Sequence, residues 1–391
     1  MNYILFDGPF RNALLPFTYT RPVADIRIGI LTIREKWETF LGLTTTTVTE
    51  DYLSKKFPMV EFSDNTMING SYLPTQELVD MLQNLNENEA IFDGEVVVAF
   101  RVSDTQETID FTQFKIHNCP ESVLSIKNTW DIFQLNGVAI EADFNLITKD
   151  KTSQSIPETV KTSNETHIFI EEGANLNHCV LNATDGPIYI GKNAEIMEGS
   201  LVRGPFALCE NSALKMGAKI YGPTTVGPHS KVGGEVNNSI IFGYSNKAHD
   251  GFLGNSVIGE WCNLGADTNT SNLKNNYAEV RLWNYESENF ARTGLQFCGL
   301  MMGDHSKCSI NTMFNTGTVV GVCANIFSSG FPRNFVPSFS WGGNQGMSTY
   351  LTKKAFEVAS AVFQRRGLEF SQQDAEILEQ VFKMTNKHRP A

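Results

Sequence analysis

The stretch IGKNAEIMEGSLVRGPFALCENSALKMGAKIYGPTTVGPHSKV, residues 190–232, decides the fold of most of this 391-residue chain. Every sixth residue in it is aliphatic, and four places after each of the first seven comes a small residue, except at Phe206. The aliphatic residues are Ile190, Ile196, Val202, Leu208, Leu214, Ile220, Val226 and Val232. A helix repeats every ~3.6 residues and a simple strand every ~2, so neither explains this period. A solenoid with three flat strands per coil does, because its stacked coils bury one continuous apolar column.

The same frame continues beyond residue 232. It is interrupted there, returns at Phe252, Ile258 and Leu264, and returns again in steps of six from Met302 to Ile326. We therefore predict an all-β left-handed parallel β-helix of hexapeptide repeats over residues 167–335. A chance alternation in an ordinary β-sandwich is the alternative, but it would need eight consecutive aliphatic residues at one spacing.

The flanking sequence predicts three further parts. Residues 1–146 have the mixed strand and helix patterns of a compact α/β domain, residues 147–166 are polar and aperiodic like a linker, and residues 336–391 form a helical extension. In the N-terminal domain we expect strands at 3–6, 66–68, 90–92 and 96–100 and helices at 30–40 and 76–85. In the extension we expect helices at 352–366 and 372–383.

Composition narrows the class of protein. The hydrophobic content of 41% can build sizeable cores, and the net charge of −12 argues against nucleic acid as a partner. The seven cysteines show no C-x-x-C pair, which favours a reducing compartment, and no apolar run approaches ~18 residues. We expect a cytoplasmic protein that does not span or bind a membrane.

The interruption of the repeat contains the main chemical motif. It holds Lys247-Ala248-His249, Phe252-Leu253-Gly254, Ser256-Val257-Ile258-Gly259, Asn263-Leu264-Gly265-Ala266 and Asn272-Leu273. This pattern resembles the acetyltransferase domain of the bifunctional glucosamine-1-phosphate N-acetyltransferase/uridylyltransferase (GlmU-type) family, in particular its archaeal-like branch. The resemblance implies an acyltransferase that uses acetyl-CoA.

The resemblance also implies roles for individual residues. His249 matches the family's catalytic base, Glu235 a carboxylate near the amino sugar, and Asn272 and Asn263 groups that bind the sugar and orient its amine. These residue types suit the chemistry, since a histidine can take a proton from an attacking amine at neutral pH and a carboxylate can hold that histidine in place. A surface histidine on an inserted loop is the alternative interpretation of His249.

Further residues complete the expected acetyltransferase site. Lys247, Lys274 and Arg203 are each either a phosphate ligand or a solvated charge. The positions that match the family's acetyl-CoA contacts are Ala266, Ile310 and Ser328. Three residues depart from the family pattern and could tune or abolish the reaction, namely Phe252 in place of tyrosine, Asp267 in place of glycine, and Asp250 in place of an apolar residue. A further histidine, His305, lies on a repeat turn and is expected to face solvent.

The N-terminal domain carries a second resemblance. Its opening resembles the start of sugar-phosphate nucleotidyltransferases at Gly8, Arg11, Leu15-Pro16, Thr18 and Arg21-Pro22. In those enzymes a glycine-rich loop lets backbone N–H groups approach a nucleotide phosphate. Asn69-Gly70-Ser71 resembles their N-G-D motif, whose aspartate holds Mg²⁺. Here Phe10 replaces a loop glycine and Ser71 replaces the aspartate. The resemblance therefore implies a truncated nucleotidyltransferase-like domain, with Gly8, Arg11, Arg21, Asn69 and Gly70 as candidates and no metal ligand assigned. The whole chain most resembles a bacterial subgroup of sugar nucleotidyltransferase-like proteins with short N-terminal domains.

Three hypotheses about function follow. The leading one is acetyl transfer from acetyl-CoA to an amino-sugar phosphate, with glucosamine 1-phosphate as the first candidate, in a homotrimer whose sites lie between solenoids. The second is nucleotidyl transfer by the N-terminal domain, with UTP and Mg²⁺, and with the β-helix serving assembly or regulation. The third is a sugar-nucleotide-binding protein without catalysis.

Overall fold

The computed structural model describes residues 2–103 and 109–390, which form two compact units. Unit 1 comprises residues 1–26 and 31–128, and unit 2 comprises residues 27–30 and 129–391. The boundary thus falls before residue 129, and not near the predicted position 146.

Unit 1 is an α/β unit around a six-stranded mixed sheet in the order β2-β1-β3-β5-β4-β6. Its strands are β1 (Asn2–Phe6), β2 (Thr46–Val48), β3 (Asn65–Asn69), β4 (Glu89–Asp93), β5 (Val96–Val102) and β6 (Lys115–Asn118). Its α-helices are α1 (Ile33–Leu41), α2 (Asp51–Ser54) and α3 (Gln76–Gln83). A capping box between Thr32 and Glu35 starts α1, and Gly42 in the left-handed conformation ends it. The predicted strands and helices of this region are confirmed.

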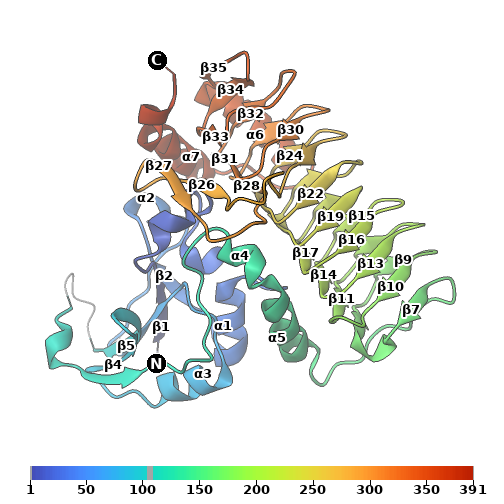
Figure 1. Ribbon diagram of the computed structural model, residues 1–391. Coiled ribbons are helices and arrows are strands. Elements are labelled where there is room, and N and C mark those ends of the chain that lie inside the picture. Colours follow the sequence, from blue (N-terminus) through green and yellow to red (C-terminus); the bar gives the residue numbers. More distant parts are fainter. Residues whose placement is uncertain (1, 104–108, 391) are drawn as a thin grey trace. The chain divides into compact units, whose positions relative to one another are not determined.

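Unit 2 is built around a parallel β-solenoid, as predicted, with three strand faces per coil (Figure 1). Face 1 comprises β7 (Lys161–Ser163), β10 (Val180–Asn182), β13 (Leu201–Arg203), β16 (Lys219–Tyr221), β19 (Glu235–Asn237) and β22 (Phe252–Gly254). Face 2 comprises β8 (Ile168–Ile170), β11 (Ile188–Ile190), β14 (Phe206–Leu208), β17 (Thr224–Val226), β20 (Ile240–Gly243), β23 (Val257–Glu260), β28 (Leu300–Met302), β31 (Thr318–Val320) and β33 (Phe335–Val336). Face 3 comprises β9 (Asn175–Leu176), β12 (Glu195–Ile196), β15 (Ala213–Leu214), β18 (Lys231–Val232), β21 (Asn246–Lys247), β24 (Asn263–Leu264), β29 (Lys307–Cys308), β32 (Asn325–Ile326) and β34 (Ser340–Gly343), and β35 (Gly346–Thr349) pairs antiparallel with β34.

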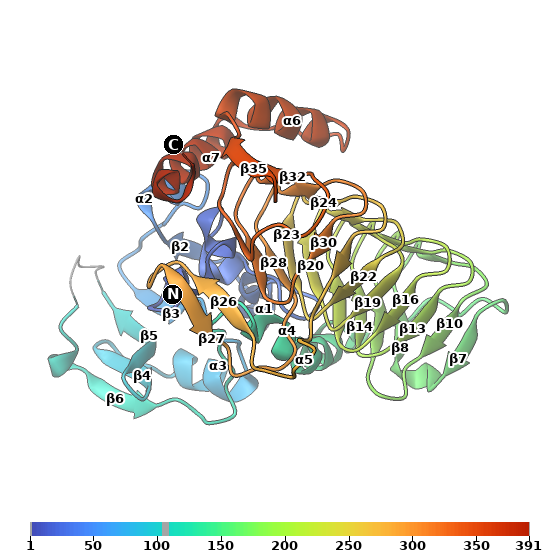
Figure 2. The ribbon, with the colours of Figure 1, turned by 45° about the horizontal axis from the view of Figure 1, so that its top comes forward.

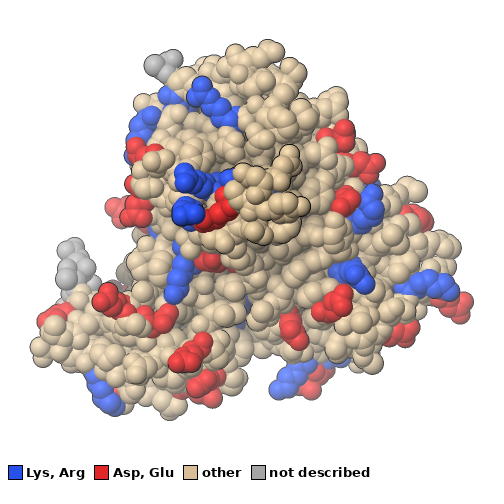
Figure 3. Space-filling model, in the orientation of Figure 1, with Lys and Arg blue, Asp and Glu red and all other residues tan. Residues whose placement is uncertain are grey.

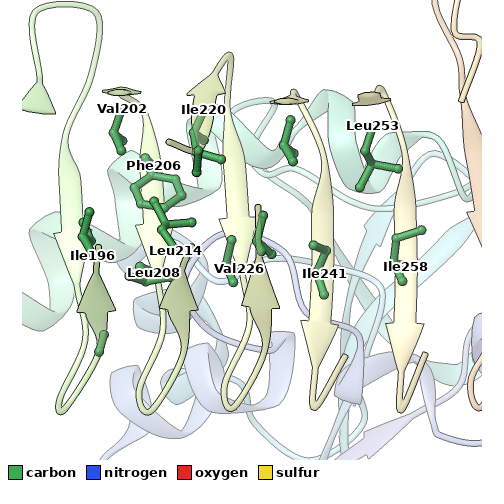
Figure 4. Close-up of a cluster of buried hydrophobic side chains, with 14 of the residues drawn as sticks. Ile196, Val202, Phe206, Leu208, Leu214, Ile220, Val226, Ile241, Leu253 and Ile258 are labelled. Atoms are coloured by element: carbon green, nitrogen blue, oxygen red, sulfur yellow. The ribbon is translucent and has the colours of Figure 1, made fainter. Parts of the chain in front are cut away.

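The predicted apolar column forms the core of the solenoid. All eight aliphatic residues from Ile190 to Val232 are buried in one hydrophobic cluster, and consecutive coils superpose their side chains (Figure 4). Met302, Cys308, Phe314, Val320 and Ile326 continue it. The small residues four places later are buried as well, because the coil turns there with little room for bulk.

The interruption after Val232 is a shortening of the coils, and the solenoid continues through it. Leu214 pairs with Val232 after one regular coil, whereas the coil that leads from Val232 to its partner Lys247 is shorter. The shortening shifts the frame, so the prediction that Phe252 faces inward is wrong. Leu253 is fully buried in the core, and Phe252 lies on the outer side of face 1.

The first coil begins earlier than predicted. β7 lies inside the expected linker and pairs in parallel with β10. Before it, the backbone N–H of Gln154 donates to the carbonyl oxygen of Ile170, and Ser153 Oγ accepts from the N–H of Ile170. Part of the polar segment 147–166 therefore packs on the solenoid.

Two segments from the N-terminal half belong to unit 2. These are residues 27–30 and the helices α4 (Asp131–Gln134) and α5 (Asn136–Thr148). Thr225 on face 2 donates to the carbonyl oxygen of Gly29 at 2.9 Å, and Asn136 Oδ1 accepts from the N–H of Gly29 at 2.8 Å. Asp143 accepts from the N–H of Ile30 at 2.7 Å. These hydrogen bonds fasten both segments to the solenoid.

The last coils carry three additions. The hairpin β26 (Arg281–Asn284) and β27 (Asn289–Arg292) lies in a long excursion between β25 (Asn269–Thr270) and β28, and β25 pairs with β30 (Met313–Phe314). The C-terminal helices α6 (Thr352–Gln364) and α7 (Gln372–Met384) lie beside these coils, as Figure 2 shows, and match their predicted ranges. Phe363 of α6 stacks on Trp261 with ring centroids 3.9 Å apart.

His305 is placed differently from the prediction. It is partly buried and stacks with Trp261 and Phe363, at centroid distances of 6.2 and 6.0 Å, and so does not face open solvent. The packing of α6 over this corner of the solenoid is the reason.

Candidate functional site

The outer side of face 1 brings the polar residues of β16 and β19 next to Phe252 and Gly254 of β22. Parallel register places Lys219, Glu235 and Phe252 side by side, with Tyr221, Asn237 and Gly254 forming the next outward row. Strands in a sheet lie about 4.8 Å apart, so these side chains are near neighbours. The inward residues between the two rows are the buried Ile220, Val236 and Leu253.

Glu235 is held by a tyrosine. The hydroxyl of Tyr221 donates to Oε1 of Glu235 at 2.6 Å. This hydrogen bond is the main cause that raises the pKa of Tyr221, because the neutral phenol is the form that donates to the carboxylate. This hydrogen bond orients the carboxylate that is predicted to lie near the amino sugar.

His249 lies on the corner at which the chain turns from face 3 to face 1, and its side chain is exposed. The backbone N–H of Glu235 donates to the carbonyl oxygen of Gly251 at 3.2 Å, which joins the corner loop 248–251 to the strand of Glu235. In the preceding coil a Cβ on Gly234 would lie 2.9 Å from the carbonyl oxygen of His249. A glycine with φ of +72° at that point lets the two coils approach so closely.

The predicted acetyl-CoA contacts share one position of the coil with His249. On face 3 the inward residues of four successive coils are Lys247, Leu264, Cys308 and Ile326. Two residues after each of them come, in the same order, His249, Ala266, Ile310 and Ser328. They therefore form a single column along four successive coils, which we call the His249 column. Ile310 is 66% exposed in this column, and Ser328 Oγ bonds to Asn344 at 2.9 Å.

The two asparagines lie on opposite sides of the corner. Asn272 Nδ2 donates to Asn255 Oδ1 at 2.8 Å, and a Cβ on Gly254 would lie 2.6 Å from that nitrogen, so Asn272 lies at the far end of face 1. Asn263 is exposed on face 3 beside Asn246. The structure thus brings Asn272, but not Asn263, onto the face that carries Glu235.

The three predicted phosphate ligands have different surroundings. Arg203 lies on β13 of face 1 and is largely exposed, with its nearest carboxylate, Asp185, at 3.9 Å. Lys274 Nζ donates to the carbonyl oxygen of Glu279 at 3.0 Å. Lys247 is only 3% exposed and points into the solenoid, so it does not lie on any surface that could meet a phosphate.

Sequence reasoning missed Lys219, Tyr221 and Asn237. Lys219 pairs with Glu235 across one of the shortened coils, so counting along the chain in regular coils does not align the two. The signal that finds these residues is the strand register, which depends on where the coils shorten.

Asp267 stands where the pattern has glycine, and the backbone explains why this is possible. It has φ of +56°, at a corner where Gly199, Gly217 and Gly234 in earlier coils also have positive φ. Aspartate and asparagine tolerate this conformation better than most residues. Its N–H donates to the carbonyl oxygen of Asp250 at 3.0 Å, which continues the stacking of the coils.

In unit 1, the predicted glycine and asparagine residues come together. A Cβ on Gly8 would lie 2.4 Å from Asn69 Nδ2, and a Cβ on Gly70 would lie 3.0 Å from the backbone nitrogen of Ala24. Asn69 Oδ1 accepts from the N–H and the hydroxyl of Ser71, which is fully buried. The position expected to carry a metal-binding aspartate is therefore a neutral hydroxyl turned toward Asn69.

The predicted arginines of unit 1 are engaged in the fold. Arg11 Nε donates to Asp7 at 2.9 Å, and its Nη2 donates to the carbonyl oxygen of Thr18 at 2.7 Å. Arg21 is 5% exposed. Burial raises the pKa of Asp7 despite its bonds to Thr49, Val23 and Arg11. Across residues 2–103 and 109–390, no group of three or more His, Cys, Asp or Glu side chains is arranged to hold a metal ion.

Two cavities lie away from all these residues. One of about 520 Å³ in unit 1 is lined by Glu77, Asp80, Glu89 and His117 among others. One of about 500 Å³ in unit 2 is lined by Arg333, Phe335, His388 and Arg389 among others. On the face drawn in Figure 3, basic and acidic side chains are interspersed and form no continuous basic surface. Within the part of the chain that the structure describes, no helix has the length and apolar content to cross a membrane.

Comparison with known proteins finds one matching family model and several similar curated proteins. Residues 3–152 match the family model described as sugar nucleotidyl transferase. A bifunctional protein GlmU of Synechococcus elongatus is 26% identical over 276 residues, which are 68% of this chain and 54% of that protein. A bifunctional sugar-1-phosphate nucleotidylyltransferase/acetyltransferase of Sulfurisphaera tokodaii is 28% identical over 144 residues, 36% of this chain and 35% of that one.

Solved structures of hexapeptide-type proteins are more distant. The UDP-N-acetylglucosamine acyltransferase of Francisella novicida is 13% identical, with a TM-score of 0.31 over 59% of this chain and 85% of that one. The chain spans about half the length of the Synechococcus relative and less of the Sulfurisphaera one. Residues 3–152 thus match the sugar nucleotidyl transferase family, and most of the chain is similar to the GlmU-type bifunctional proteins.

Proposed function

We propose that this chain transfers the acetyl group of acetyl-CoA to the amine of an amino-sugar phosphate, with glucosamine 1-phosphate as the first candidate. The observation that carries the proposal is the His249 column, in which the candidate base and the three candidate acetyl-CoA contacts occupy the same place in four successive coils. The names of the relatives, which include acetyltransferases, support the same chemistry.

The residues suggest the following reaction. The amine nitrogen attacks the thioester carbonyl carbon while His249 accepts the amine proton, the carbon–sulfur bond breaks, and the departing CoA thiolate takes that proton. Glu235, fixed by Tyr221, lies on the face next to this corner and can orient the amino sugar. Lys219 and Arg203 on the same face supply positive charge for its phosphate.

We also propose a homotrimer. The His249 column is a ridge at a corner of the solenoid, and Ile310 in it is exposed. A ridge can contact an extended acetyl-CoA on one side only. A neighbouring solenoid would contact its other side and exclude water from the thioester. Sedimentation equilibrium should then give three times the chain mass of 43.5 kDa, and a monomer that turns over substrate would contradict this assembly.

His249→Ala tests the catalytic proposal. Release of free CoA thiol in the presence of acetyl-CoA and glucosamine 1-phosphate should fall about a hundredfold or more, the usual scale for loss of a general base. His178→Ala is a matched control, because His178 is an exposed histidine at the same corner position of an earlier coil, two residues after Leu176. Equal turnover of both variants would remove the proposed mechanism.

Nucleotidyl transfer by unit 1 is the second candidate. The match of residues 3–152 to the sugar nucleotidyl transferase model and the close approach of Gly8 to Asn69 favour it. The neutral, buried Ser71 does not provide the carboxylate that the resemblance implies for Mg²⁺, so we derive no metal-dependent step. Pyrophosphate release from UTP and N-acetylglucosamine 1-phosphate with added Mg²⁺ would establish this activity. Calorimetric binding of CoA or UDP-sugars without turnover would instead indicate a binding protein.

A further inference from the structure

A lysine occupies the apolar interior of the solenoid. Along face 3, register aligns Leu214, Val232, Lys247, Leu264 and Cys308 as successive inward residues. Lys247 is 3% exposed there, in a column that is otherwise aliphatic or thiol. Burying a lysine in such a place costs stability, because the ammonium group loses its hydration.

The ammonium group of Lys247 reaches one specific acceptor. Its Nζ lies 2.5 Å from the carbonyl oxygen of His249 and donates to it. Desolvation lowers the pKa of Lys247 to about 8. The charges of Asp250 and Asp267 and the thiol of Cys308 act in the opposite direction and favour the ammonium form, while Lys219 adds to the lowering.

The loop that carries His249 has backbone support on each side of that carbonyl. The N–H of Gly233 donates to the carbonyl oxygen of Lys247, the N–H of Asp267 to that of Asp250, and the N–H of Glu235 to that of Gly251. The carbonyl of His249 is instead held by a side chain that reaches it from the inside of the coil.

We propose that Lys247 is a positioning residue, which from inside the solenoid fixes the backbone of His249 and thereby the direction in which the imidazole leaves the corner. This inference deepens the proposed acetyl transfer and rests on it. A methionine at this inward position would carry no charge to desolvate, so the lysine lowers the stability of the coil while it holds the corner in place. The sequence suggested a phosphate ligand at Lys247, and the geometry assigns it to the support of His249 instead.

Lys247→Met tests this, with Lys231→Met as control. Lys231 is an exposed lysine on the adjacent strand β18, and its register partner is Asn246. In Lys247→Met we expect an unchanged or higher melting temperature, faster amide hydrogen exchange at residues 248–251, and at least a tenfold fall in kcat with KM little changed. Lys231→Met should match the wild type in all four measurements.

The outcomes separate the alternatives. Unchanged exchange at 248–251 and unchanged kcat in Lys247→Met would overturn the proposal. A lower melting temperature with kcat reduced only in proportion to the folded fraction would also overturn it, because the lysine would then be merely structural. If Lys247→Met does not fold, Lys247→Gln, which keeps a neutral donor, takes its place and should give intermediate exchange rates. If the wild type shows no acetyl transfer, the proposed function fails, while the exchange measurement still decides whether Lys247 holds the loop.

Discussion

The hydroxyl of Tyr221 donates a hydrogen bond to Glu235 across the neighbouring strands β16 and β19, at 2.6 Å. We expect Tyr221→Phe to lower acetyl transfer about threefold to tenfold, because an exposed hydrogen bond to a carboxylate contributes on the order of 1 kcal/mol. The melting temperature should hardly change, since the phenol ring is retained. Initial rates at saturating acetyl-CoA would measure the effect. Full activity of the variant would show that the orientation of Glu235 is not set by this tyrosine.

Gly251, the last residue of the corner loop 248–251, should not tolerate a side chain. Gly251 has φ of +114°, and a Cβ there would lie 2.2 Å from the carbonyl oxygen of Thr268. Gly217 also has positive φ, at +70°, but a Cβ there would meet no atom within 4 Å. We therefore expect Gly217→Ala to cost about 1 kcal/mol of unfolding free energy and Gly251→Ala clearly more. Urea denaturation of both variants compares them, and equal costs would mean that the coils can separate at this corner.

Phe206 should be a main contributor to the stability of the solenoid. It is the one large side chain among the small residues that follow the repeat, and it is fully buried. Phe206→Ala should cost about 3–5 kcal/mol, from lost burial and the cavity that remains. Met216→Ala, at a side chain that is 69% exposed, should change the unfolding free energy by less than about 0.5 kcal/mol. Denaturant midpoints of the two variants, compared at equal dependence of the unfolding free energy on denaturant, would test this difference. A small loss of unfolding free energy in Phe206→Ala would mean that neighbouring coils collapse into the cavity.

Stability should rise with pH because of Lys247. Its pKa is about 8 in the folded protein and 10.5 without burial, so the unfolded chain binds the proton more tightly. The penalty of burying this lysine is therefore complete below about pH 8 and is relieved as the pH rises toward about 10.5. Each unit by which the pKa is lowered corresponds to about 1.4 kcal/mol, so burying the charged lysine lowers the unfolding free energy by an amount on the order of 3 kcal/mol.

A comparison across pH isolates this contribution. The difference in unfolding free energy between wild type and Lys247→Met should shrink between about pH 8 and 10, while other titrating groups act equally on both proteins. A difference that stays constant over this range would show that the buried amine keeps its ordinary proton affinity.

The six-residue period was enough to predict the solenoid and its inward column, because each inward position must be apolar whatever its neighbours along the chain are. Ile190 to Val232 are buried as the pattern required. Four strands of unit 1 and the two C-terminal helices were also predictable, since their periodicity is local, whereas β2 and β6 were not predicted. The resemblance to a known family supplied Glu235, His249 and the acetyl-CoA positions as candidates.

The tertiary structure decided the rest, because in a solenoid the length of each coil sets which residues face inward and which residues are neighbours. The shorter coils around Val232 turned Phe252 outward, placed Lys247 inside, and set Lys219 beside Glu235. The stacking of coils also placed Ala266 and Ile310 in one column with His249, although a long excursion of the chain separates Ala266 from Ile310. Sequence determined which residues must be buried in a regular repeat, and only the packing of unequal coils against one another determined which polar residues meet.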